Sequence, residues 1–338
     1  MHFQNVVVHS LAAIEPPVRL TSLDICNRLR TTLDRLGMPA NIIEDKTGIT
    51  ARRVWENGTL PSDAATLAAE KVLGHTNIDR SDIGLIINTS VCRDYLEPST
   101  ACIVHGNLGL SSECLNFDVG NACLGFMNGM DIAARMIERG DIAHALIVDG
   151  ETSGPITDAT IERLLGDDVD ESQFRAQFAS LTLGSGAAAM VMSDARLCPD
   201  GHRYTGCITR SASQFNQLCK GQMEWMETDT RVLLKEGLGL ARQTYAAAIE
   251  TMQWHADRMD VIVIHQVSRI HTESIIELLG LERSKIHTIF QEFGNIGPAG
   301  VPITLAHAVE LGKVRKGDRV ALMGIGSGLN CSMAEVLW

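Results

Sequence analysis

Short apolar runs alternate with longer amphipathic stretches along most of the chain. Buried strands are predicted by the apolar runs at 83–91, 115–120, 144–151, 187–193, 260–268 and 319–326. Apolar residues at helical spacing predict helices at about 124–139, 228–255, 270–280 and 302–312. Because strands and helices alternate, the pattern indicates an α/β fold with layered, buried sheets.

Two strand patterns occur twice. DIGLIINTS at 82–90 resembles MDVIVIHQVS at 259–268, and HALIVDGETSG at 144–154 resembles RVALMGIGSG at 319–328. In each half, the first of these strands precedes the second by about 60 residues. The alternative is a chance match, since all buried strands look similar. We expect two duplicated halves that meet near residues 190–210, with the ranges 1–195 and 196–338.

Composition excludes several classes of protein. The 338 residues are enough for about two domains. A net charge of −12 and an aromatic content of 4% argue against a nucleic-acid-binding protein, which needs a basic surface or stacking side chains. No apolar run of 18 residues and no signal-peptide pattern occur. Nine cysteines without a CxxC pair predict reduced thiols, no metal site and a cytoplasmic location.

The segment FDVGNACLGFMNGMDIAARMIERG places a cysteine at a strand-to-helix turn. The strand ends at Gly120, Cys123 follows, and Gly140 is suited to end the helix. The partial positive charge of a helix N-terminus stabilises a thiolate and lowers the thiol pKa, and a free N–H at the turn can bind an oxyanion. Cys123 is therefore a candidate nucleophile. The alternative is a small buried cysteine, which is our interpretation of the other eight.

A histidine and an asparagine are further candidates. His265 ends the apolar run VIVIH, and α/β folds present functional groups at the carboxyl ends of strands. Asn295 lies in EFGNIGPAGVP, whose glycines and proline hold the amide rigid, so that it can help His265 bind an oxygen anion. A core histidine and a turn asparagine are the alternatives. His271 and His287 do not end a strand and are expected to be structural.

Other motifs point away from dinucleotides and proteases. GIGSGLNCSMAEV at 324–336 is followed by no helix and no acidic residue at the expected distance, and GSGAAA at 184–189 leads into a strand. We expect these glycines to allow a close backbone approach near the active site. Cys, His and Asn also define papain-like proteases, but Cys123 lacks their local sequence.

NACLGF, VIHQ, GNIGPAGVP and a terminal GIGSG, in this order, resemble β-ketoacyl-acyl carrier protein synthase III enzymes of the thiolase superfamily. GITARR at 48–53 is similar to a GI-x-x-R segment of that family. Within the family, SVCRDYLEPSTA, MNGMDIAARMIERG and GIGSGLNCSMAEV look like the condensing enzymes of bacterial long-chain olefin biosynthesis. The resemblance covers nearly the whole chain. It implies an α-β-α-β-α layered, thiolase-like fold of two similar halves, and a homodimer.

The resemblance also implies roles. Cys123 attacks a long-chain acyl-CoA and holds the acyl group covalently. Its backbone N–H forms an oxyanion hole with one from the Ser327–Gly328 turn. His265 and Asn295 hold the thioester oxygen of a second acyl-CoA. The substrates are coenzyme A thioesters, and no other cofactor is implied.

The α-carbon of the second acyl group distinguishes two reactions. Synthase III enzymes release CO₂ from a malonyl thioester and need no base, whereas joining two unactivated acyl-CoAs requires one. In the olefin group, a glutamate of the LEPST segment is thought to reach across the dimer, and it corresponds to Glu97. Without the resemblance, Glu97 is a surface residue before Pro98.

The favoured function is a Claisen condensation without decarboxylation, giving a 2-alkyl-3-ketoalkanoic acid that downstream olefin-pathway enzymes would use. A decarboxylative synthase III using malonyl-acyl carrier protein is the alternative, and a catalytically silent acyl-binding protein is a third hypothesis. At the substrate entrance, the chain has a lysine where the family favours arginine before TGI, and a serine where it has asparagine. The residues expected there are Lys46, Arg53, Ser268 and Arg269.

Overall fold

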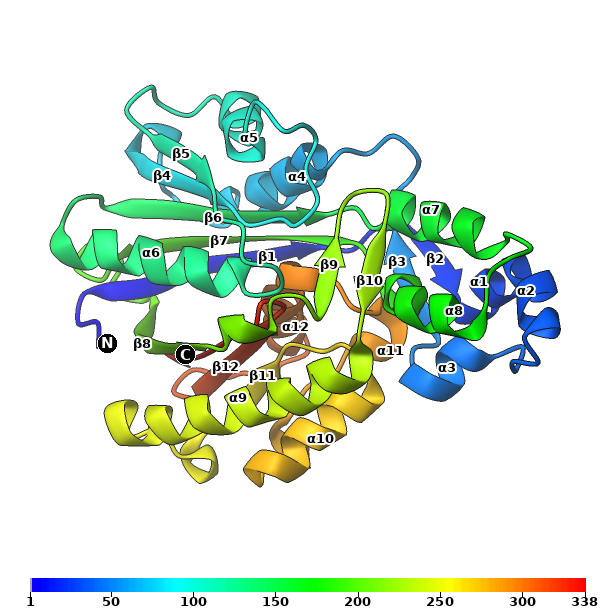
Figure 1. The fold of residues 1–338 in the computed structure, drawn as a ribbon. Helices are drawn as coiled ribbons and strands as arrows, with labels where there is room; N and C mark the ends of the chain where they lie inside the picture. The colour runs from blue at the N-terminus through cyan, green and yellow to red at the C-terminus, as the bar shows by residue number, and fades with distance from the viewer. Residues whose placement is uncertain (1) are drawn as a thin grey trace.

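The structure, a computed structural model, describes residues 2–338 and is built around one large mixed sheet (Figure 1). Its strands are β1 (Val6–Ile14), β4 (Ile83–Asn88), β5 (Leu115–Asp118), β6 (His144–Glu151), β7 (Gly186–Asp194), β8 (His202–Ser211), β11 (Val261–Ile264), β12 (Arg319–Gly326) and β13 (Asn330–Leu337). They are ordered β11-β12-β13-β8-β1-β7-β6-β4-β5. Two small sheets pair β2 (Val18–Thr21) with β3 (Ala51–Val54), and β9 (Cys219–Gly221) with β10 (Met226–Thr228).

The helices are α1 (Ser22–Arg28), α2 (Arg30–Arg35), α3 (Ile42–Thr47), α4 (Pro61–Leu73), α5 (Thr100–Leu108), α6 (Gly125–Arg139), α7 (Gly154–Leu164), α8 (Glu171–Gln177), α9 (Thr230–Met252), α10 (Arg269–Leu279), α11 (Phe290–Phe293) and α12 (Gly300–Glu310). In residues 2–338, no helix is both long and apolar enough to cross a bilayer.

The strand arrangement of the first half recurs in the second. β4 is parallel to β6, and β6, β7 and β1 follow as antiparallel neighbours. Likewise, β11 is parallel to β12, and β12, β13 and β8 follow as antiparallel neighbours. The two similar strand patterns in the sequence therefore correspond to a strand arrangement that occurs twice in the structure. The boundary at residues 195 and 196 lies in the connection from β7 to β8 and stays a prediction.

Five layers result from how the helices cover the strands. The largest buried cluster joins side chains of α6 and α12 with strands of both halves. A second cluster packs α4 and α5 on the outer face of the first half, and a third packs α9 and α10 on that of the second. Figure 1 shows the two outer pairs at the top and bottom of the molecule. The expected α-β-α-β-α layering is confirmed.

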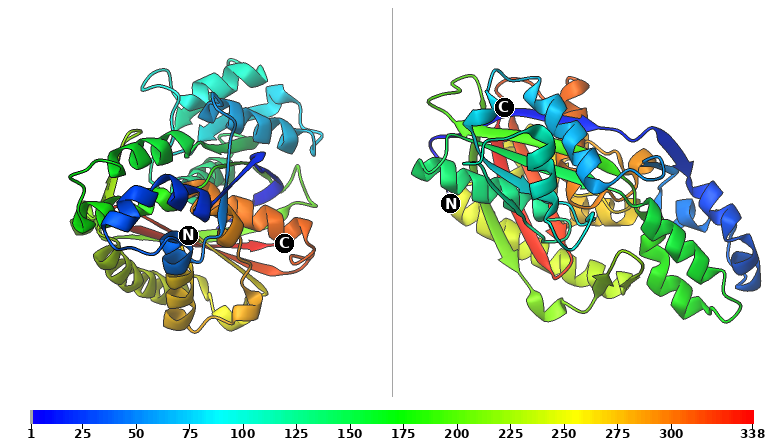
Figure 2. Two further views of the ribbon diagram at one scale, coloured as in Figure 1. Left: turned by 90° about the vertical axis from the view of Figure 1, so that its right-hand side faces the viewer. Right: turned by 90° about the horizontal axis from the view of Figure 1, so that it is seen from above.

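Alternate residues of one strand serve different layers. In β6, Ala145 and Ile147 join the central cluster, while Leu146 and Val148 join the outer one. Both faces of the strand are thus buried, which explains why it has no polar alternation in sequence. A fourth buried cluster joins α1, α2, α3, α7 and α8. These helices form a separate lobe at one end of the layers, at the lower right in the right-hand view of Figure 2.

All the predicted strands and helices are present in the structure, some with shifted ends, but helices α1–α5, α7, α8 and α11 and strands β1–β3, β8–β10 and β13 were not predicted. The strand predicted at 260–268 stops at Ile264, because Ser268 caps α10 by accepting a hydrogen bond from the backbone N–H of His271. The sequence prediction did not include β1, β8 and β13, although these strands join the two halves. The β13 strand follows β12 directly through the glycine-rich turn.

Candidate active site

Cys123 lies in the turn between β5 and α6, as the sequence predicts. The residue before it, Ala122, has a φ of +45°, in the left-handed region that residues with a side chain seldom adopt. Such backbone strain persists only where the surrounding structure imposes it, and it is common at functional sites. Helix α6 then begins at Gly125, so that Cys123 stands next to the helix N-terminus.

The pKa of Cys123 does not follow the sequence prediction. We expected the helix N-terminus to lower it, but burial raises the pKa of the thiol to about 12. Cys219, Glu151 and Asp149 raise it further, and only a hydrogen bond with the backbone of Cys123 itself opposes them. Desolvation and nearby negative charge therefore outweigh the helix terminus. The resting thiol is protonated at neutral pH.

The glycine-rich turn after β12 approaches the nucleophile closely. A Cβ atom on Gly326 would lie 3.3 Å from the backbone nitrogen of Cys123, so a side chain there would crowd the turn. Asn330 donates a hydrogen bond of 3.1 Å from Nδ2 to Oδ1 of Asn121. Gly326 and Asn330 are register partners that enclose Ser327 and Gly328. The structure thus places the two predicted oxyanion-hole residues in the turn beside Cys123.

His265 follows β11 directly and is 2% exposed. Its backbone N–H donates to the carbonyl of Met323 in β12 at 2.7 Å. Burial, and then the neighbouring His271, lower the pKa of His265 to about 3. The imidazole is therefore neutral at physiological pH, and a neutral ring carries one N–H that can donate to an oxygen atom.

His271 is closer to the site than we expected from the sequence. Its ring lies 6.5 Å from that of His265, centroid to centroid, and burial lowers its pKa to about 4. The prediction missed this neighbour because His271 lies in the first turn of α10 and not at a strand end. The six-residue spacing after His265 was the only available signal.

Asn295 is fixed through its backbone and its side chain. Its N–H donates to the carbonyl of Thr182 at 2.9 Å, and its carbonyl accepts from Gly184 at 2.8 Å. Its side-chain Oδ1 accepts from the N–H of Gly297 at 3.1 Å. Because the oxygen is used in this way, the amide N–H groups of Asn295 remain as donors.

The segments of Asn295 and His265 meet. A Cβ on Gly300, the first residue of α12, would lie 3.3 Å from Nδ1 of His265. That Nδ1 atom is buried and has no hydrogen-bond partner in residues 2–338. The loop from Asn295 to Gly300 therefore lies against the imidazole.

The same loop also approaches the surroundings of Cys123. A Cβ on Gly297 would lie 3.6 Å from the carboxyl carbon of Glu151, the last residue of β6. Glu151 is in turn near enough to raise the pKa of Cys123. The structure thus gathers the Cys123, His265 and Asn295 segments at the carboxyl ends of parallel strands, the usual place for sites in α/β folds. Sequence reasoning missed Glu151, although its place at the end of a predicted strand was a signal.

Glu97 is set apart from this group. It is exposed, in the loop between β4 and α5, and has no hydrogen-bond or ion-pair partner in the described chain. Asp94 ties the loop down by accepting from the N–H of Ser62 at 3.0 Å. Beyond that point, Tyr95 is 57% and Leu96 93% exposed. The loop therefore presents an apolar tip and a free carboxylate at the surface.

The four residues expected at the substrate entrance lie on α3, β3 and the start of α10, namely Lys46, Arg53, Ser268 and Arg269. Arg269 donates from Nη2 to the carbonyl of Asp45 at 3.3 Å, which brings α10 beside the exposed Lys46. Arg53 instead forms an ion pair of 2.7 Å with Glu15.

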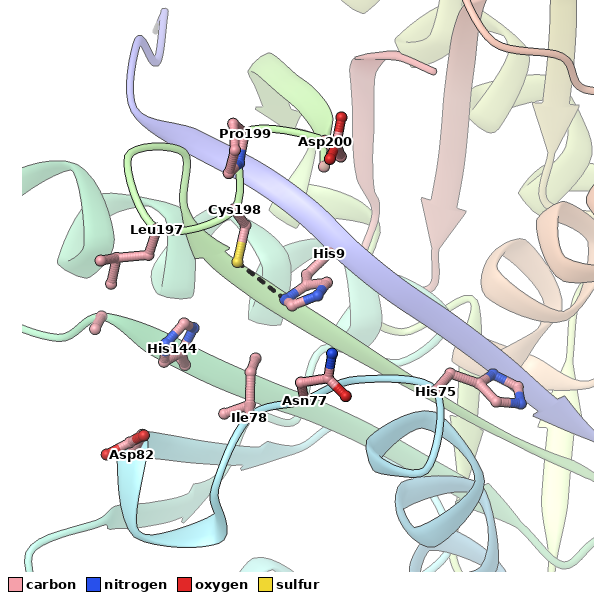
Figure 3. Close-up of a pocket in the computed structure, with 12 residues that line it drawn as sticks. His9, His75, Asn77, Ile78, Asp82, His144, Leu197, Cys198, Pro199 and Asp200 are labelled. Atoms are coloured by element: carbon pink, nitrogen blue, oxygen red, sulfur yellow. Dashed lines mark hydrogen bonds between the residues drawn. The ribbon is translucent and has the colours of Figure 1, made fainter.

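A second group of polar residues surrounds a cavity of about 790 Å³ (Figure 3). There the thiol of Cys198 lies 3.1 Å from Nδ1 of His9, and His144 lines the same cavity. No set of three or more His, Cys, Asp or Glu residues in the described chain is close enough for a metal ion. His144 begins β6, whereas Glu151 ends it. The cavity is thus at the opposite end of the strand, and we do not include it in the active site.

Gln266 stabilises the segment behind His265. Its Oε1 accepts from the N–H groups of Ile289 and Phe290 at 2.8 and 3.1 Å, and its Nε2 donates to the carbonyl of His287 at 3.0 Å. Gln266→Leu leaves three buried backbone groups without partners, and we expect it to lower the free energy of unfolding by about 3 kcal/mol in urea titrations. Gln243→Leu, at an exposed position of α9, should change it by less than about 0.5 kcal/mol. Equal stability of the two variants would contradict this prediction.

The lowered pKa of His271 predicts a dependence of stability on pH. Between pH 6.5 and about 4, the unfolded chain binds a proton at this residue that the folded chain does not. Acidification therefore lowers the free energy of unfolding, and this effect of His271 vanishes above pH 6.5. From pH 7 to pH 5, we expect the native protein to lose about 2 kcal/mol more stability than His271→Asn in urea titrations at each pH. Parallel stability curves would show that His271 protonates normally in the folded state.

Comparisons with known proteins agree with this geometry. The 3-oxoacyl-[acyl-carrier-protein] synthase III family model matches residues 117–203, and the model of its C-terminal part matches residues 249–338. The acyl-CoA:acyl-CoA alkyltransferase of Xanthomonas campestris pv. campestris is 56% identical over 338 residues, all of both chains. That of Shewanella oneidensis is 35% identical, again over all of both chains.

A solved structure gives the same result. Cerulenin-bound OleA of Xanthomonas campestris superposes with a TM-score of 0.98, covering 100% of this chain and 98% of that one, at 56% identity. A β-ketoacyl-[acyl-carrier-protein] synthase III of Clostridium tetani is more distant, at 26% identity. The chain therefore belongs to the acyl-CoA:acyl-CoA alkyltransferase (OleA) family, within the synthase III-like condensing enzymes of the thiolase superfamily.

Proposed function

We propose that this protein joins two long-chain fatty acyl-CoAs by a Claisen condensation without decarboxylation. The product is a 2-alkyl-3-ketoalkanoic acid, and the reaction is the first step of long-chain olefin biosynthesis. The observation that carries this proposal is the 56% identity, over the whole of both chains, with an acyl-CoA:acyl-CoA alkyltransferase.

The spacing of residues in that relative supports the proposed catalytic set. Structures of Xanthomonas campestris OleA have been solved with one glutamate, one cysteine or one histidine replaced. The glutamate precedes the cysteine by 26 positions, and the histidine follows it by 142. The same intervals separate Glu97 from Cys123 and Cys123 from His265. Lauric acid and lauroyl-CoA are bound in a further structure of that protein.

In the first step, Cys123 takes an acyl group from acyl-CoA. Its sulfur bonds to the thioester carbon, the bond from that carbon to the CoA sulfur breaks, and the thiol proton ends on the released CoA. The backbone N–H of Cys123 and one from the Ser327–Gly328 turn stabilise the negative oxygen that forms on the way. Because the resting thiol is protonated, with a pKa of about 12, its proton must leave as the carbon–sulfur bond forms.

In the second step, Glu97 of the partner subunit removes a proton from the α-carbon of another acyl-CoA. The enolate oxygen accepts hydrogen bonds from His265 and Asn295, each typically worth about 3–4 kcal/mol. The α-carbon then bonds to the carbonyl carbon of the acyl group on Cys123, and the bond between that carbonyl carbon and the Cys123 sulfur breaks. Water hydrolyses the remaining thioester, which releases CoA and the β-keto acid. The atoms and electrons balance with water as the other reactant, so we propose no cofactor beyond the CoA thioesters.

We propose a homodimer because Glu97, the proposed base, lies away from Cys123, His265 and Asn295 of its own chain. The loop that carries Glu97 holds it at the surface with an apolar tip. Strand β5, at the edge of the sheet, also exposes Leu115 and Phe117, and an exposed apolar edge strand offers a surface on which another chain can pack. A second copy of this chain on that edge would cover both. We further propose that the dimer works in the cytoplasm and passes its product to later enzymes of the olefin pathway.

The test is to incubate the purified protein with myristoyl-CoA alone, follow the release of thiol, and identify the products by mass spectrometry. A β-keto acid, or the ketone formed from it by loss of CO₂, is the expected result. A strict requirement for a malonyl thioester would instead show a decarboxylative synthase III. Absence of any acyl group on Cys123 would show a catalytically silent protein.

A further inference from the structure

Glu151 is a buried carboxylate that the proposed reaction does not use. It is 5% exposed, ends β6, and forms no ion pair with any cationic residue of the described chain. Its partners are two backbone donors and the thiol of Cys92. Oε1 accepts from the N–H of Val91 at 2.6 Å, and Oε2 from the N–H of Cys92 at 3.4 Å. Burial raises the pKa of the Glu151 carboxyl, while hydrogen bonds from the thiol of Cys92 and the N–H groups of Val91 and Cys92 lower it.

These contacts extend the pairing of β4 with β6 beyond the end of the sheet. The backbone ladder ends where Asn88 faces Val148, and side chains then replace it. Thr89 donates from Oγ1 to Asp149 at 2.6 Å, and the N–H of Gly150 donates to Oγ of Ser90 at 2.8 Å. Glu151 provides the last of these links. It therefore sets the direction in which the chain leaves the sheet toward Glu97, five residues after Cys92.

Glu151 also lies beside the second functional loop. Its carboxyl carbon would lie 3.6 Å from a Cβ on Gly297, in the loop whose N–H fixes the side chain of Asn295. Its backbone carbonyl accepts a hydrogen bond of 3.0 Å from Nε1 of Trp55. One side chain thus hydrogen-bonds the segment that leads to the proposed base and fills the space beside the loop that carries the proposed oxyanion donor.

We propose that Glu151 is a positioning residue of the condensation step, whose carboxylate holds the Glu97 loop and the Asn295 loop in place relative to Cys123. This inference rests on the proposed function. Glu151 does not touch the reacting atoms. It acts on the partner's site through Glu97 and on its own site through Asn295. Misplacing a catalytic group by about 1 Å can reduce a rate about 100-fold, so an anchor shared by two such groups should matter for condensation more than for acylation.

Two variants separate the reach of the side chain from its charge. Glu151→Asp keeps the carboxylate but is one methylene shorter, so it cannot reach Val91 and Cys92. Glu151→Gln keeps the length and one acceptor oxygen, but places an amide NH₂ against the N–H of Cys92. Glu162→Gln is the matched control, since Glu162 is exposed on α7 and has no partner in the described chain.

The experiment measures two rates per folded molecule with lauroyl-CoA. One is the first-turnover burst of CoA release, which reports acylation of Cys123, and the other is steady-state formation of β-keto acid. We expect both variants to keep the burst within about threefold and to lose at least about tenfold in condensation, with Glu151→Asp the more affected. The pH profile of the burst should move to lower pH in Glu151→Gln only, because a negative neighbour of the thiol is gone while Asp149 and Cys219 remain.

The outcomes distinguish a failure of the positioning role of Glu151 from a failure of the proposed function. If the native protein and Glu162→Gln condense acyl groups and the Glu151 variants keep the native ratio of condensation to acylation, the positioning role is wrong. A residue that only supports the fold would also keep this ratio, since it would lower both rates together with the amount of folded protein. If the native protein itself forms no β-keto acid, the proposed function fails, and the inference about Glu151 fails with it.

Discussion

Cys123→Ala is expected to abolish condensation, with a loss of at least about 10³-fold in the steady-state rate. The acyl group must be held covalently while the second acyl-CoA binds, and no other thiol lies in the turn before α6. The variant should also take up no acyl group from lauroyl-CoA, which intact-protein mass spectrometry would show. The fold should be retained, because alanine fills most of the space of a small, partly buried cysteine.

A matched cysteine variant makes this result specific. Cys198→Ser changes a thiol at the opposite end of β6, where it contacts His9, and should keep the native condensation rate within about twofold. Cys123→Ser retains a hydroxyl, which is a weaker nucleophile than a thiol, and should be acylated much more slowly than the native protein. A Cys123→Ala protein that still condenses acyl-CoAs would show that no acyl-cysteine intermediate is formed.

Local sequence marked Cys123, His265 and Asn295 as candidates because each stands at a strand end or in a glycine-rich turn, and the family resemblance assigned their roles. Those positions depend on neighbours in the chain, and the structure places them where the pattern predicts. The pKa of Cys123 could not be predicted in the same way. Its direction is set by burial and by Cys219 and Glu151, which lie far away in sequence.

Strand β8 and the contacts of Glu151 also depend on residues that are distant in sequence. Strand β8, with the sequence HRYTGCITRS, was not predicted because its polar and apolar residues do not form a clear run, and pairing with β1 and β13 defines it instead. Glu151 was not singled out because its contacts reach 60 residues back to Val91. The end of a predicted strand marked Glu151, but the partners that suggest its role, Val91 and Cys92, become its neighbours only after folding.

Glu97→Ala is expected to separate the two steps of the reaction. Acylation of Cys123 does not require removal of a proton from carbon, so the burst of CoA release should remain. Formation of β-keto acid does require it and should fall by at least about 10²-fold. Glu97→Gln should behave alike, since an amide cannot accept the α-proton. The substitution should not affect stability, because Glu97 is exposed and has no partner in the described chain. Loss of the burst together with the product would show that Glu97 supports the site rather than acting as the base.

Whether Glu97 acts across the dimer can be tested with two inactive variants. Cys123→Ala and Glu97→Ala chains carrying different tags are co-expressed, and the heterodimer is isolated through both tags. If Glu97 serves the partner's site, the subunit with an intact Cys123 receives an intact Glu97 from its partner, so one site of two is complete and about half of the native activity returns. If Glu97 serves its own site, each site lacks one group and the heterodimer stays inactive. Half-activity would also require that β5 and the loop from Asp94 to Glu97 lie in the dimer interface, because only there can this carboxylate reach another active site.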